Sequence, residues 1–90
     1  MTAEVLIRWI EDLHVRVERG ELDRLGPIDV GYGPLPAVLT TRLLLADYDE
    51  LEDLPPGVLE PAEVAARRRE LAGDFGRLLW ELTLAETQSA

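Results

Sequence analysis

The sequence predicts an all-α protein: a three-helix domain with an extended glycine- and proline-rich arm between the first two helices, and a long C-terminal helix. Three observations support this class. Apolar residues recur at helical spacing in three segments, leucine supplies 17 of the 90 residues, and proline and glycine separate the segments. We expect helices at about 3–19, 37–54 and 61–86, in one domain covering 1–87 with a frayed tail at 88–90.

The first predicted helix, residues 3–19, is amphipathic and has a clear start and end. Thr2 is a suitable N-cap, and Glu4 places a negative charge in the first turn, where the helix dipole favours it. Gly20 is a suitable residue to end the helix. The face expected to be buried carries the apolar residues that recur every three or four positions, which are Leu6, Ile10, Leu13 and Val17.

The arm, residues 26–36, contains three glycines and three prolines, a composition that excludes a helix. Ile28, Val30 and Tyr32 alternate with smaller or polar residues, which is the period of an extended strand. One interpretation is a loop whose apolar residues cover the helical core. The other is an arm that uses these three residues as an interface and pairs as a strand with a partner or a second copy.

The second predicted helix, residues 37–54, has apolar residues around most of its circumference in its first half. Such a helix is normally buried between other helices. A strand over 39–45 is the competing interpretation, but the three consecutive leucines at 43–45 show no alternation. Pro55 and Pro56 end the helix, after an acidic run made of Asp47, Asp49, Glu50, Glu52 and Asp53.

The third predicted helix, residues 61–86, begins at Pro61 and has two apolar faces. Gly73 and Gly76 fall inside it, so the chain either breaks there, with Asp74 as a new cap, or continues and leaves room for close approach. We favour the continuous helix, because the inner row keeps its phase across the glycines. That row is Val64, Arg68, Leu71, Phe75, Leu78, Leu82 and Ala85, and the opposite strip, a predicted interface, is Gly73, Gly76, Trp80 and Leu84.

The net charge of −9 limits the classes of partner. All nine cations are arginines, and an excess of acid argues against direct binding to nucleic acid, which depends on neutralising phosphates. A basic protein partner is compatible with this charge. The chain has no cysteine, no apolar run long enough to span a membrane and no basic, apolar leader, so we expect a cytoplasmic protein.

The acidic run resembles a calcium-binding loop only in the spacing of Asp47 and Asp49. The glycine and glutamate that such a loop needs further along are replaced by Glu52 and Val58, so we expect no metal and no cofactor. Acids at the end of a helix oppose its dipole and call for a cation nearby. Arg68, on the inner row of the third helix, is therefore expected to pair with a carboxylate of the run, which we assign to Asp47, Glu50 or Asp53.

Arg8 and His14 are the candidate catalytic residues. Five residues separate them, and this resembles the arginine–histidine spacing of HEPN-type ribonucleases, which are small helical proteins and often dimers. The resemblance covers two residues and implies a ribonuclease that uses both side chains. On a straight helix the two point about 120° apart, which is awkward for one site. The alternative is a histidine at the edge of the core.

The leading functional hypothesis is a non-enzymatic scaffold or adaptor that forms a homodimer through its last helix and offers an acidic surface to a larger partner. Two alternatives stay open. One is an acidic inhibitor or antitoxin that blocks a basic nuclease or DNA-binding protein. The other is the small ribonuclease using Arg8 and His14.

Overall fold

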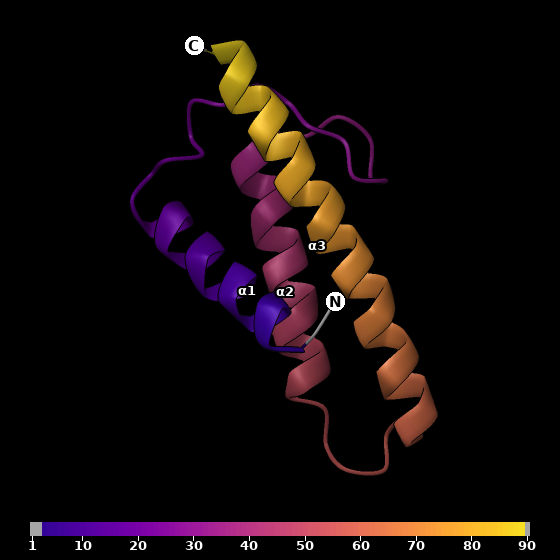
Figure 1. Ribbon diagram of the computed structural model, residues 1–90. Coiled ribbons are helices and arrows are strands. Elements are labelled where there is room, and N and C mark those ends of the chain that lie inside the picture. The colour runs from indigo at the N-terminus through magenta and orange to yellow at the C-terminus, as the bar shows by residue number, and fades with distance from the viewer. Residues whose placement is uncertain (1–2, 90) are drawn as a thin grey trace.

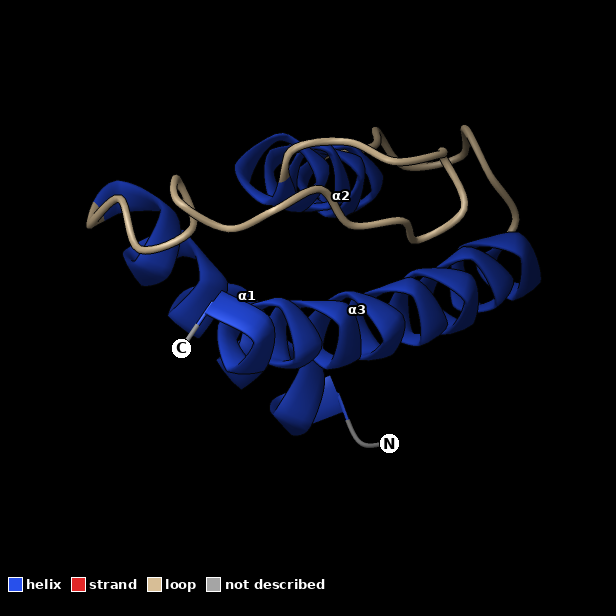
Figure 2. Ribbon diagram, turned by 90° about the horizontal axis from the view of Figure 1, so that it is seen from above, coloured by secondary structure: helices blue, strands red, loops and turns tan. Residues whose placement is uncertain are grey.

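A computed structural model describes residues 3–89 and confirms the all-α class and the three helices. They are α1 (Ala3–Glu18), α2 (Ala37–Glu52) and α3 (Pro61–Ser89) (Figure 1). α2 and α3 run antiparallel and make the most extensive contact. α1 crosses the direction of α3, and the loops lie on the α2 side of the molecule (Figure 2). The expected N-cap, Thr2, lies outside the described residues.

α3 is one unbroken helix through Gly73 and Gly76, as the phase of its inner row predicts. Its 29 residues correspond to about 44 Å, nearly the 46 Å length of the molecule. It ends at Ser89, beyond the expected end at residue 86, and Ala90 lies outside the described residues. Close to this end, Ala85 is buried and Arg16 of α1 forms an ion pair with Glu86.

The core lies where the inner faces of the three helices meet. Tyr48 of α2 packs edge-on against Phe75 of α3, with ring centroids 6.4 Å apart and planes at 81°. Burying each large apolar side chain contributes about 1.5–3 kcal/mol. The largest fully buried apolar side chains come from all three helices and the connecting loop, and are Leu13, Leu22, Leu44, Phe75, Leu78 and Leu82.

The arm folds onto its own chain. Ile28 and Leu35 form an antiparallel bridge, in which each N–H donates to the other's carbonyl at 2.9 and 3.0 Å. The turn between them needs glycine, because Gly31 and Gly33 have φ angles of 116° and 86°, and both donate N–H bonds to Oδ1 of Asp29. The assignment of Ile28 and Val30 to an interface with a partner is corrected here: both are buried in the core of their own chain.

α2 is less buried than its sequence suggests. Leu39 and Leu43 are 43% and 40% exposed, on the side of α2 opposite the buried Leu44 and Thr41. Among residues 3–89, the elements packed around α2 are α1, α3 and the arm, and these lie on its other sides. The expectation of a helix buried around its circumference is therefore wrong for the separate chain.

Thr40 provides a test of this packing. It is 1% exposed and its Oγ1 has no hydrogen-bond partner among residues 3–89, whereas the adjacent Thr41 donates from Oγ1 to the carbonyl of Ala37 at 2.9 Å. A buried, unpaired hydroxyl costs about 1–3 kcal/mol. We therefore expect Thr40→Val to raise the free energy of unfolding by about 1 kcal/mol, measured by urea denaturation. Thr41→Val is the matched control and should give no gain; equal gains at both positions would contradict this account.

Candidate functional site

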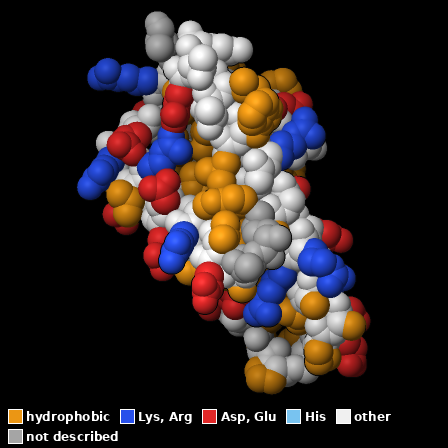
Figure 3. All heavy atoms as spheres, viewed as in Figure 1, with side chains coloured by type: hydrophobic (Ala, Val, Ile, Leu, Met, Phe, Trp, Pro, Cys, Tyr) orange, Lys and Arg blue, Asp and Glu red, His pale blue; other side chains and the backbone are white. Residues whose placement is uncertain are grey.

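The main candidate site is the outer strip of α3, defined as Gly73, Gly76, Trp80 and Leu84. These residues lie on the side of α3 opposite its buried row. Trp80 is 63% exposed and Leu84 is 37% exposed. Figure 3 shows hydrophobic side chains at the surface over the C-terminal half of α3. Tryptophan is a residue that protein interfaces favour, and a large indole in open water is poorly placed in a separate chain.

The two glycines of the strip are not required by the packing of the chain itself. Apart from its chain neighbours and the backbone of its own helical turns, a methyl group at Gly73 or Gly76 would meet no atom of residues 3–89 within 4 Å. Each glycine costs about 1 kcal/mol relative to alanine inside a helix. The bare backbone beside Trp80 therefore leaves space that residues 3–89 do not fill.

Two arginines flank the outer strip. Arg69 lies one turn before Gly73, and Arg77 one turn after it, and both are exposed. Neither forms an ion pair with another of residues 3–89, whereas Arg67 reaches Glu70 at 3.6 Å and Arg16 pairs with Glu21 and Glu86. The strip thus has a basic half, around Arg69 and Arg77, and an apolar half, formed by Trp80 and Leu84.

Arg68 binds the acidic run at the end of α2, but through Glu52. Its Nε donates to Oε1 at 2.9 Å and its Nη2 to Oε2 at 3.2 Å, and the Glu52 hydrogen bond, then its charge, raises the pKa of Arg68. The assigned partners, Asp47, Glu50 and Asp53, are corrected here. Glu52 lies one turn after Tyr48, which packs on Phe75, so this acid faces α3. Because both side chains are substantially exposed, the pair contributes about 1 kcal/mol at most.

Asp47 instead holds the arm. The Tyr32 hydroxyl donates to Oδ2 of Asp47 at 3.3 Å. Partial burial raises the pKa of Tyr32, as do the charges of Asp47 and Asp74, while Arg67 opposes this shift. Tyr32, assigned from the sequence to an interface, is 53% exposed but has this partner within its own chain.

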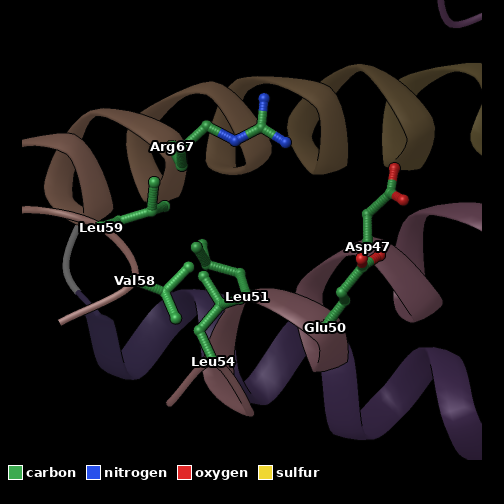
Figure 4. Close-up of a pocket in the computed structure, with 7 residues that line it drawn as sticks. All are labelled: Asp47, Glu50, Leu51, Leu54, Val58, Leu59 and Arg67. Atoms are coloured by element: carbon green, nitrogen blue, oxygen red, sulfur yellow. The ribbon is translucent and has the colours of Figure 1, made fainter. Parts of the chain in front are cut away.

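A shallow hollow lies between α2 and α3, near the loop that joins them. Figure 4 shows Arg67 extending over it toward Asp47. Its volume of about 210 Å³ is below the range of about 300–1,000 Å³ typical of small-molecule pockets. We therefore interpret it as a surface depression. Its lining is Asp47, Glu50, Leu51, Leu54, Val58, Leu59 and Arg67.

Arg8 and His14 are not brought together by the fold. Both side chains are exposed on α1, a regular helix whose buried face is Leu6, Ile10 and Leu13. The two therefore point about 120° apart, as on any straight helix. Across residues 3–89, no cluster of three or more histidine, aspartate or glutamate side chains is arranged to hold a metal ion.

Sequence reasoning missed a second exposed surface, on α2. Leu39, Leu43 and Ala46 form an apolar stripe that continues into Glu50 and Asp53. The signal was present, since these residues are spaced four, three, four and three apart, as on one side of a helix. It was hidden because the leucines next to them made the whole helix resemble a buried one.

The glycines of the outer strip give a prediction of stability. Gly73→Ala and Gly76→Ala should each raise the free energy of unfolding of the separate chain by about 1 kcal/mol, because alanine favours the helix and has room there. Thermal unfolding followed by circular dichroism at low protein concentration measures the effect. Gly57→Ala is the control and should destabilise, since Gly57 has a φ of 89°. Destabilisation at position 73 or 76 would rule out an open, continuous helix.

Asp74 gives a prediction of pH dependence. Burial raises its pKa above the ordinary value, and the charges of Glu70 and Asp47 add to the shift. A raised carboxyl pKa means that folding favours the protonated form, so ionised Asp74 lowers stability at neutral pH, and this cost disappears as pH falls below the ordinary carboxyl pKa. Asp74→Asn should therefore melt at a higher temperature than the parent protein at neutral pH, with a smaller difference in acid.

Asp12→Asn, on the exposed side of α1, is the control because it changes the net charge equally. Equal effects of the two substitutions at neutral pH would show that net charge, and not the surroundings of Asp74, sets the difference.

Comparison with known proteins gives no information about this site. No family model matches the sequence, and neither a curated protein nor a solved structure matches it. In residues 3–89, no helix combines the length and the apolar character needed to cross a membrane.

Proposed function

We propose that this protein is a small, acidic, non-enzymatic scaffold or adaptor that self-associates through the outer strip of α3. The observation that carries the proposal is the exposure of Trp80, at 63%, beside two helix glycines whose surroundings are open. In the separate chain, both glycines lower the stability of the helix and the indole of Trp80 stays exposed to water. A second protein surface against the strip would remove the indole from water and use the space at the glycines.

A second copy is the simplest occupant of the strip. Soluble proteins assemble most often with copies of themselves. The strip joins an apolar half to a basic half, and this chain, with a net charge of −9, carries ample acidic surface for the basic half. Action in the cytoplasm, without a catalytic step, is part of the same proposal.

An acidic inhibitor or antitoxin remains the alternative function. It is favoured by the acids at the end of α2, where Asp49, Glu50 and Asp53 are exposed and no basic residue lies in the last turn. This class would bind a basic protein with an affinity that falls steeply as salt increases. Self-association through Trp80 and Leu84 should depend on salt much less.

Sedimentation velocity over a wide range of protein concentration tests the proposal. The parent protein should form species larger than a monomer, and Trp80→Ala should weaken association by about 2 kcal/mol or more, roughly thirtyfold, as expected for a central interface tryptophan. Val58→Ala is the matched control, since Val58 is 56% exposed but lies in the α2–α3 loop. A parent protein that stays monomeric throughout would refute the proposal.

A further inference from the structure

The surface that receives the outer strip can be inferred from α2. Its exposed side carries a seam, defined as Leu39, Leu43, Ala46, Glu50 and Asp53. The first three residues are apolar and the last two are acidic. The seam therefore has an apolar half near the N-terminus of α2 and an acidic half at its C-terminus.

The acidic half of the seam is not neutralised by an ion pair within residues 3–89. The last turn of α2 contains no basic residue, and acids there oppose the helix dipole. Two arginines of α3 reach this region: Arg68 is paired with Glu52, and Arg67, which lines the hollow together with Glu50, is paired with Glu70. Glu50 and Asp53 form no ion pair with any of residues 3–89. Cations supplied from outside would relieve this excess of negative charge.

The outer strip of α3 carries properties that complement those of the seam, in the reverse order along the chain. Its basic half comes first along the chain, at Arg69 and Arg77, and its apolar half follows, at Trp80 and Leu84. We propose that the outer strip of α3 in one copy docks antiparallel on the α2 seam of the next copy. This inference rests on the proposed self-association and specifies the second surface that takes part in it.

Helical spacing alone sets a register in which both halves match. If Leu43 lies opposite Trp80 of the next copy, Leu39 lies opposite Leu84, because both pairs are four residues apart. The same register places Glu50 opposite Gly73, with an arginine one turn away on either side. Asp53 then lies opposite Glu70 and beside Arg69, and Ala46 lies opposite Arg77. The leucines meet tryptophan and leucine, and each acid lies within one turn of an arginine.

Pairing either surface with its own copy is less favourable. An antiparallel pair of outer strips with Trp80 on Gly73 brings the two Arg77 side chains together and places Leu84 against Arg69. Two seams in parallel would oppose acid to acid, and two antiparallel seams would oppose leucine to acid. Like charges at such positions destabilise helix contacts. The strip-on-seam arrangement pairs both leucines of the seam with apolar residues and places both of its acids within one turn of an arginine.

The arrangement also determines the type of assembly. The seam lies opposite Leu44, and the outer strip lies opposite Leu78 and Leu82, so each surface points away from the shared core. They cannot meet within one chain. Two different surfaces that bind each other form a heterologous contact, which adds copies until it closes into a ring or continues as a chain.

Two variants with one defective surface each provide the test. Leu43→Glu damages the seam and Trp80→Glu damages the strip, and both positions are exposed in the separate chain, so folding should be retained. Circular dichroism melts check this. Each variant alone should be monomeric by sedimentation velocity. A mixture of the two should form a complex of two chains and no larger species, because each supplies the surface that the other lacks.

A mixture of Trp80→Glu with Leu84→Glu is the control and should stay monomeric, since both lack a working strip. Charge exchange is a second measurement: Asp53→Arg and Arg69→Asp should each weaken association, and the chain carrying both should recover most of it. These results would support the inference.

Three outcomes would overturn the inference. If Leu43→Glu associates as the parent protein does while Trp80→Glu does not, the strip pairs with something other than the seam, and the proposed self-association stands. If the folded variants stay monomeric when mixed although the parent protein associates, the strip-on-seam contact is wrong. A parent protein that is monomeric at every concentration refutes both the inference and the proposed function.

Discussion

The structure depends on the contact between the buried row of α3 and the inner face of α2. Phe75, Leu78 and Leu82 are fully buried there, and Phe75 packs edge-on against Tyr48. This contact keeps α3 continuous past two glycines, which together cost about 2 kcal/mol of helix stability. Burial of Phe75 and Leu78, on either side of Gly76, contributes about 1.5–3 kcal/mol each and outweighs that cost. The continuity of α3 is therefore a consequence of packing.

A continuous α3 fixes the position of everything on its outer side. Gly73, Trp80 and Leu84 form one strip because the helix keeps its phase from end to end. A break at the glycines would have turned Trp80 away from Gly73. The arm closes the opposite side of the core through Ile28 and Val30, so α2 and α3 each retain one uncovered apolar surface, and both surfaces lie on rigid helices. The proposed assembly and the internal packing thus use the same two helices.

The parts of this fold that follow from helical period could be predicted from the sequence. The row Leu71, Phe75, Leu78 and Leu82 is buried as its spacing requires, and Pro61 begins α3 as expected. The side that the arm would cover was not predictable, because alternation in residues 28–32 says which residues share a face and not what that face meets. The helical period also does not fix how two helices are rotated relative to each other. Arg68 was therefore assigned to Asp47, Glu50 or Asp53, although its partner is Glu52 of the same acidic run. The exposure of Leu39 and Leu43 depends on the number of helices available to cover them, which no local pattern contains.

The central claim is that the outer strip of α3 is covered when the protein assembles, and the fluorescence of Trp80 tests it most directly. In a Trp9→Phe variant, Trp80 is the one remaining tryptophan. Its emission should resemble that of a water-exposed indole in dilute solution and move to shorter wavelength as protein concentration rises and the strip becomes covered. Emission that keeps the wavelength of an exposed indole at every concentration, including those at which sedimentation detects larger species, would contradict the account.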